Sequence, residues 1–129
     1  GIEATRGIPR DALVMAVPSR LLMSATGSAR RDRELVRVAR RHGGLDDANM
    51  LAVHLMRERN KGKASFWHKY IQALPTTYTN LHQFNEENIL ELQDSFAMAK
   101  ARQAVRSLHT DFDTKVVHVL RDLAIAGDA

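Results

Sequence analysis

Histidines and paired carboxylates are the side chains of this chain that could do chemistry, but their spacing predicts no local reactive site. His109 and His118 are nine residues apart, so one helical turn does not bring both imidazoles to a single metal ion. Adjacent acids such as Asp46 and Asp47 do not converge and are typical of helix starts. The sequence has no cysteine, which excludes disulfides and thiolate metal sites. Phosphate-binding loops, dinucleotide glycine patterns and helical zinc motifs are also missing. We therefore expect no catalytic residue and no metal site here.

Arginines concentrated between residues 30 and 41 form the strongest charge pattern in a chain of net charge +4. Arg30, Arg33, Arg37 and Arg40 follow the three-and-four spacing of one helix face. Such a face suits the phosphates of a nucleic acid. However, no aromatic residues are interleaved for stacking, and an apolar stripe lies opposite. A solvated helix face is the favoured interpretation, so nucleic acid is a partner that the sequence leaves open without favouring it.

The first 24 residues predict a β-hairpin. Two β-leaning runs, GIEATRGI and ALVMAVP, are separated by the turn-like Pro9-Arg10-Asp11. Pro18 closes the second run, because proline has no N–H to give to a ladder.

Everything after the hairpin has helical periodicity. Ser28, Asp46 and Asn85 are the expected N-caps, and Gly43-Gly44 is a natural helix stop. The last helix has the strongest periodicity in the chain. Its apolar stripe consists of Met98, Ala101, Val105, Leu108, Phe112, Val116, Val119 and Leu123. The predicted helices span residues 29–42, 47–59, 65–73, 86–94 and 96–123. The sequence thus predicts a helix-dominated α+β fold.

An aromatic cluster in SFWHKYIQALPTTY, residues 65–78, stands out in a chain that is only 5% aromatic. We expect Trp67 to be largely buried against the 47–59 helix or the long C-terminal helix, and its truncation to cost about 3–5 kcal/mol. Tyr70 and Tyr78 are expected to be structural. His54, in a helix that is apolar nearly all round, is expected to be a hydrogen-bonded core residue rather than a ligand.

Four segments in this order resemble the SET-domain methyltransferases: GIEATRGIPRDALVMAVPSRLLMS, LAVHLMRER, SFWHKYIQALPTTY and FNEENILELQDS. Within that family, the four segments look most like the branch that contains the Rubisco large-subunit lysine methyltransferase and the actin-histidine methyltransferase. There a glycine-led β-hairpin opens the SET domain and a helical insertion splits it. The resemblance implies an incomplete SET domain, with its N-terminal hairpin at residues 1–24 and its helical insertion at 25–129.

This resemblance implies methyl transfer from S-adenosylmethionine to a lysine or histidine of a protein substrate. In the family a glycine loop lets the backbone approach the cofactor, and Gly1 would be what remains of it. Backbone groups of the second strand hold the cofactor, which places those contacts on Ala12, Leu13 and Val14. The family often has an acidic residue where Ala12 stands.

The family's later half carries an Asn-His pair that binds the cofactor and a tyrosine that lines the methyl-transfer channel. This sequence contains no Asn-His dipeptide and no tyrosine after Tyr78. The chain is therefore expected to be the N-terminal part of a SET methyltransferase, inactive alone and binding its cofactor weakly or not at all.

Two other hypotheses stay open at this point. One is a non-catalytic SET-like subunit of a larger assembly, including an organellar nucleoprotein assembly. The other is a free-standing helical module that binds through the 98–123 stripe. No run approaches the roughly 18 apolar residues of a membrane span. The sequence does not choose between plastid, cytoplasm and nucleus.

Overall fold

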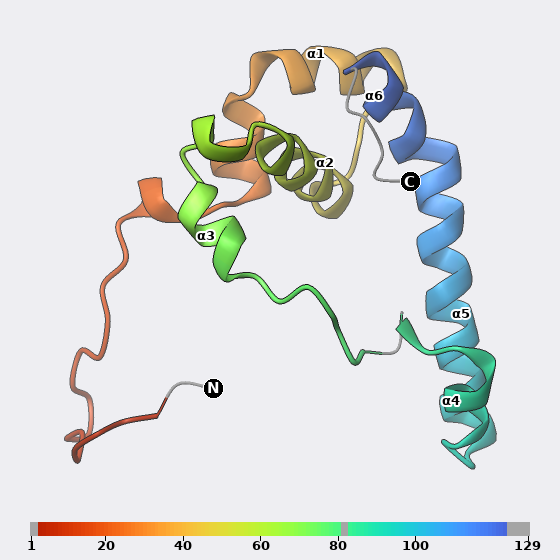
Figure 1. The fold of residues 1–129 in the computed structure, drawn as a ribbon, viewed down its shortest axis with the longest axis horizontal. Coiled ribbons are helices and arrows are strands. Elements are labelled where there is room, and N and C mark those ends of the chain that lie inside the picture. The colour runs from red at the N-terminus through yellow and green to blue at the C-terminus, as the bar shows by residue number, and fades with distance from the viewer. Residues whose placement is uncertain (1–2, 81–82, 124–129) are drawn as a thin grey trace.

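Short helices make up the regular structure of the chain, whose computed structural model describes residues 3–80 and 83–123 (Figure 1). The α-helices are α1 (Arg33–Arg41), α2 (Asp47–Asn60), α3 (His68–Ala73), α4 (Glu86–Leu90), α5 (Ser95–Asp111) and α6 (Val117–Asp122). Shorter turns accompany them: 3-10 turns at Ser19–Leu21 and Gly62–Ala64, and π-helical turns at Ala25–Ala29 and Phe112–Val116.

Most helices begin where a short polar side chain caps them. The Asp46 carboxylate accepts a hydrogen bond from Asn49 N (2.9 Å), and the Asn85 side chain accepts one from Asn88 N (2.8 Å). These two predicted caps are confirmed. The predicted cap at Ser28 is wrong, because its hydroxyl bonds back to Ser24 within the π turn. Asp32 caps α1 instead, by accepting from Leu35 N (3.1 Å).

Two glycines end α1, as the sequence predicted. Gly43 and Gly44 have φ angles of 85° and 88°, in the left-handed region that favours glycine. Gly44 N donates to Ala39 O (2.9 Å), and Gly43 N donates to Arg40 O (3.3 Å). This pair of hydrogen bonds is a Schellman motif, which satisfies carbonyls that the helix end leaves free.

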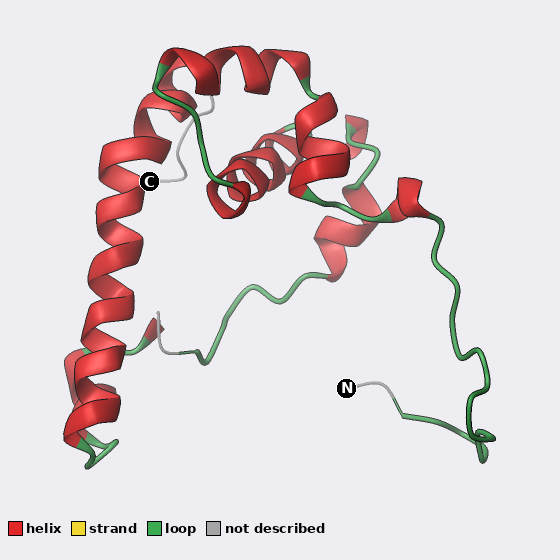
Figure 2. Ribbon diagram, turned by 180° about the vertical axis from the view of Figure 1, so that it is seen from behind, coloured by secondary structure: helices red, strands yellow, loops and turns green. Residues whose placement is uncertain are grey.

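The predicted β-hairpin, and with it the α+β class, is wrong: Figure 2 shows loop and no strand in the described part of the N-terminal segment. The turn itself forms, since Ala12 N donates to Pro9 O (3.2 Å) and Asp11 adopts a φ of 62°. The two arms do not pair. An isolated two-stranded hairpin is marginal in water. Every described residue from 3 to 22 is exposed, so no apolar face is buried to offset the cost of ordering a ladder.

One small core joins residues 29–53 to residues 116–123. The largest fully buried side chains are Leu35 on α1, Val53 on α2 and Val119 on α6. Around them lie Ala29, Val38, Ala39, Met50 and Val116, with Leu45, Leu120 and Leu123 packed against the cluster. Because α6 packs on α1, the end of the long C-terminal helix is fixed to the body formed by α1 and α2.

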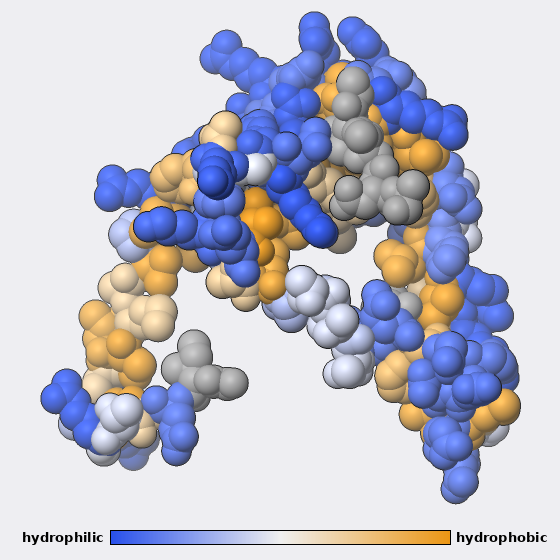
Figure 3. All heavy atoms as spheres, in the orientation of Figure 1, coloured by the Kyte–Doolittle hydropathy of each residue, from blue (hydrophilic) through white to orange (hydrophobic). Residues whose placement is uncertain are grey.

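The chain as a whole is an open arch. Figure 1 shows α5 running away from the body with α4 at its far end, while the N-terminal segment extends away on the opposite side. The accessible surface is 10295 Å². A compact monomer of 14.5 kDa would expose roughly 6,900 Å². Much of the apolar surface is therefore uncovered, which Figure 3 shows as orange on the N-terminal segment and along α5.

The long C-terminal helix forms, but a π turn divides it into α5 and α6, and its predicted apolar stripe is buried only in part. Ala101 is buried near α4, and Val116 and Val119 are buried in the core. Between these ends, Leu108 and Phe112 are 49% and 41% exposed. Bonds from i to i+5 take in one more residue per turn, so the π turn rotates the residues that follow it. That rotation accompanies the packing of α6 on the body.

We expect Gly43→Ala to lower the free energy of unfolding by about 1–2 kcal/mol, because an L-residue is strained in the left-handed conformation. No atom would meet the added methyl group, so the loss would report backbone strain alone. Urea denaturation followed by circular dichroism measures it. Gly7→Ala is the matched control, in an exposed segment where a Cβ also meets nothing, and it should change stability little. Equal stability of the two variants would show that the Schellman motif does not hold α1.

Candidate functional site

The predicted cofactor residues lie on the exposed N-terminal segment. Ala12, Leu13 and Val14 follow the turn at Pro9, and Leu13 and Val14 are 83% and 69% exposed. Together with residues 3–9 they line an open hollow of about 510 Å³. Gly1 lies outside the described residues. Apart from the turn bond, residues 3–17 make no backbone hydrogen bond to another described residue, so the amides of Leu13 and Val14 have no backbone acceptor within that part of the chain.

This hollow does not by itself fit S-adenosylmethionine as an enclosed site. Ligand pockets bury most of the surface of a molecule of that size. Here one folded-back segment lines the hollow, and no described residue of the helical body contributes to its wall. The segment offers backbone donors and acceptors but encloses nothing, so no reaction step follows from its geometry.

Arginines cover the outward face of α1, although not the set that the sequence predicted. Arg30 precedes α1 and forms an ion pair with Asp47 (2.7 Å), so it does not belong to this face. The face consists instead of Arg33, Arg37, Arg40 and Arg41, all exposed. Leu35, Val38 and Ala39 occupy the opposite side of the helix and are buried. Figure 3 shows the resulting hydrophilic surface over α1.

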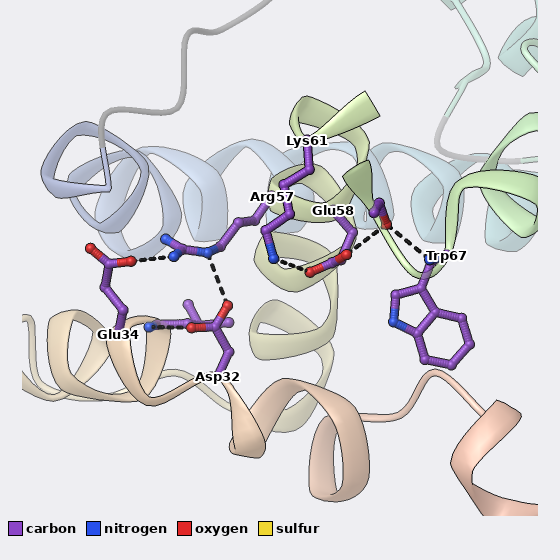
Figure 4. Close-up of polar contacts among 8 residues, drawn as sticks. Asp32, Glu34, Arg57, Glu58, Lys61 and Trp67 are labelled. Carbon is purple, nitrogen blue, oxygen red and sulfur yellow. Dashed lines mark hydrogen bonds and ion pairs between the residues drawn. The ribbon is translucent and has the colours of Figure 1, made fainter. Parts of the chain in front are cut away.

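A polar clamp ties the start of α1 to the end of α2 (Figure 4). Arg57 lies between two carboxylates of the α1 start: its Nε is 2.9 Å from Asp32 Oδ2, and its Nη2 pairs with Glu34. The Arg57 and Asp32 side chains are 18% and 13% exposed. Asp32 therefore both caps α1 and neutralises Arg57. Sequence reasoning missed this clamp, because Arg57 is 25 residues from Asp32 and 23 residues from Glu34, and no local spacing signals such contacts.

A second polar cluster links α2 to the start of α3. Ser65 Oγ donates to Glu58 Oε2 (2.6 Å) and accepts from Trp67 N (2.9 Å), while Lys61 pairs with the other oxygen of Glu58. Burial raises the pKa of Glu58, but the hydrogen bonds from Lys61 and Ser65 outweigh it, and the net pKa lies below its usual value. The carboxylate is therefore held charged in a buried position. The predicted helix start at Ser65 is wrong, because α3 begins at His68 and its N-cap residue Trp67 makes no side-chain cap hydrogen bond.

His54 is buried, as predicted, but it is not hydrogen-bonded. It is 4% exposed, and neither ring nitrogen has a hydrogen-bond partner among the described residues. Burial lowers its pKa below the usual value, and the carboxylates of Glu58 and Asp32 only partly oppose that shift. His54 is therefore neutral, and both of its buried ring nitrogens lack a partner within the described ranges.

The aromatic cluster is more exposed than predicted. Trp67 is half-buried, and Phe66 and Tyr70 are 69% and 50% exposed. The Trp67 ring makes edge contacts with both neighbours, with centroids 5.1 Å from Phe66 and 6.2 Å from Tyr70. These rings pack on one another, with Trp67 between Phe66 and Tyr70. The cost of truncating Trp67 stays a prediction.

Two classes of site are not found in the part of the chain that the structure describes. No three or more histidines, aspartates and glutamates of these residues lie close enough to hold a metal ion. None of the helices described is both long enough and apolar enough to cross a membrane.

The sequence of this chain is similar to those of several known proteins. The chain is 31% identical over 110 residues to the protein SET DOMAIN GROUP 40 of Arabidopsis thaliana, covering 83% of this chain and 22% of that protein. It is 30% identical over 112 residues to SET domain-containing protein 4 of Artemia parthenogenetica, covering 87% and 27%. The match to the actin-histidine N-methyltransferase of Drosophila melanogaster is 30% over 108 residues, covering 82% and 19%.

These matches support the SET-domain family. The chain spans between a fifth and about a quarter of the length of these SET-domain relatives. No family model matches it. No solved structure matches it either.

We expect His54→Leu to raise the free energy of unfolding by about 1–3 kcal/mol at neutral pH, because it removes two unsatisfied buried nitrogens. It should also reduce the loss of stability in acid. The pKa of His54 is lower in the folded state than its unfolded value of about 6.5. Below that pH the unfolded chain takes up a proton that the folded chain does not, so stability falls as pH falls through this window.

Urea midpoints measured between about pH 7.5 and 5.5 test this expectation. His109→Leu is the control, since it removes an exposed histidine from α5. A pH dependence that is the same in wild type, His54→Leu and His109→Leu would contradict the desolvation of His54.

Proposed function

We propose that this chain is the N-terminal part of a protein methyltransferase that moves a methyl group from S-adenosylmethionine to a side-chain nitrogen of a protein substrate. The observation that carries the proposal is the similarity over more than four fifths of the chain to SET-domain proteins. One of the similar relatives is named as an actin-histidine methyltransferase. A histidine or lysine nitrogen is therefore the proposed acceptor, and the Rubisco-lysine and actin-histidine branch is the proposed branch.

In this proposal the chain divides between residues 24 and 25. Residues 1–24 belong to the cofactor side of the SET domain, and residues 25–129 form the helical insertion. Ala12, Leu13 and Val14, with Gly1, contribute backbone contacts to the cofactor. The exposed amides of Leu13 and Val14 support this role, because they have no competing backbone acceptor among the described residues, whereas the amide of Ala12 is taken by the turn bond to Pro9 O.

The same geometry supports weak cofactor binding by the 129 residues alone. Two or three backbone hydrogen bonds contribute about 0.5–1.5 kcal/mol each. Micromolar affinity needs about 8 kcal/mol beyond the cost of ordering the ligand. The open hollow lined by residues 3–14 encloses too little of a ligand to make up that difference.

A second candidate function is a non-catalytic SET-like subunit of a larger protein assembly. The observation that favours it is the uncovered apolar surface of the arch, which includes Leu13, Phe66 and Phe96 at 83%, 69% and 71% exposure. Surfaces of this kind mark contacts with other polypeptide. The two candidates differ in whether an assembly containing this chain transfers methyl groups.

Titration calorimetry of the purified 129-residue chain with S-adenosylmethionine should detect no low-micromolar binding. Labelled cofactor should leave no methyl group on added protein acceptors. Saturable low-micromolar binding, or labelled protein, would contradict the proposed weakness of the isolated site.

The product of the whole reading frame in which these residues occur tests the activity itself. We expect it to bind the cofactor and to label a protein acceptor. Leu13→Pro should weaken cofactor binding roughly three- to tenfold, because proline removes one backbone donor. Leu13→Ala keeps that donor and is the matched control. Binding and labelling both absent from the intact product would favour the non-catalytic subunit.

A further inference from the structure

Four arginines on one face of α1 have no acidic partner within the described structure. Arg33, Arg37, Arg40 and Arg41 are exposed, and none of them makes an ion pair or side-chain hydrogen bond with another described residue. At 3.6 residues per turn, they share roughly a third of the helix circumference. We call this set the α1 arginine face.

Three carboxylates at the two ends of α1 already have partners. Asp32 and Glu34 lie at the start of the same helix, and both pair with Arg57 of α2. Asp122, near the end of α1, pairs with His42 (3.0 Å). The clamp and this pair therefore leave the four arginines without an ion pair among the residues that the structure describes.

The N-terminal part of this face is unfavourable for α1, although Arg40 and Arg41 lie in the last turn, where the helix dipole favours a cation. Arg33 and Arg37, and likewise Arg37 and Arg41, are like charges four residues apart, which is unfavourable on an isolated helix. Arg33 is also in the first turn, where the helix dipole disfavours a cation. An anionic partner would relieve both effects.

The chemistry of the face discriminates between anionic partners. Protein interfaces have an apolar or aromatic centre, and no exposed large apolar side chain lies between residues 33 and 41. Single-stranded nucleic acids bind on aromatic platforms, and the face has none. Interfaces with duplex nucleic acid are strongly positive, and arginine is a principal donor to their phosphates.

We propose that the α1 arginine face binds the phosphate backbone of duplex nucleic acid, without reading bases. This inference is independent of methyl transfer, since none of its residues belongs to the 12–14 segment. Because four arginines contact phosphates, binding should be steeply salt-dependent, with a log–log slope of about −3 to −4.

Fluorescence anisotropy with a labelled duplex DNA of about 20 base pairs tests the proposal on the 129-residue chain. Replacing Arg33, Arg37 and Arg41 together by glutamine should weaken binding at least tenfold at 50 mM salt and reduce the slope to about −1. The control replaces Arg6, Arg10 and Arg20 by glutamine, which removes the same charge from the exposed N-terminal segment. That control should bind nearly as tightly as wild type.

Replacing the same three α1 residues by lysine keeps the charge and should keep most of the affinity and the slope. Circular dichroism of each protein shows whether the glutamine variant still folds. The lysine variant separates the loss of charge from the effect of changing these three side chains. No duplex binding by wild type, or equal weakening of the two glutamine variants, would overturn the proposal. Tighter binding of a polyglutamate peptide than of the duplex would assign the face to an acidic protein instead.

Discussion

Contact between Leu35, Val53 and Val119 is the constraint on which the rest of this structure depends. These side chains come from α1, α2 and α6, and each is fully buried. Burying a side chain of this size contributes about 1.5–3 kcal/mol, so three of them and their neighbours supply much of the stability of so small a core. Because Val119 lies near the end of the long C-terminal helix, fixing it on the body forces α5 to project away from the body.

That projection explains the open arch and its uncovered surfaces. Leu108, near the C-terminal end of α5, and Phe112, in the π turn that follows, remain 49% and 41% exposed. The N-terminal segment projects on the opposite side with no partner strand among the described residues. An arch that exposes so much apolar surface agrees with the proposed role as one part of a SET methyltransferase, in which further polypeptide would cover these surfaces.

The polar clamp between α1 and α2 has a consequence for the surface. Arg57 binds the carboxylates of Asp32 and Glu34, and this pairing fixes the start of α1 against α2. Because Asp32 and Glu34 pair with Arg57, neither carboxylate forms an ion pair with the exposed arginines. A contact that stabilises the fold thus also leaves the α1 arginine face free for an external anion. The favoured interpretation from sequence, a solvated face, treated the arginines without their acidic neighbours.

The sequence by itself determined the caps at Asp46 and Asn85, the glycine stop of α1 and the stripe of the long helix. These features depend on atoms within about four residues, so local spacing predicts them. Only the tertiary structure decided that Arg30 pairs with Asp47, that Arg57 clamps α1, and that His54 is buried without hydrogen bonds. It also decided against the β-hairpin. The turn at Pro9 formed from local preference, but a ladder needs a partner and a buried face that residues far away in the chain must supply.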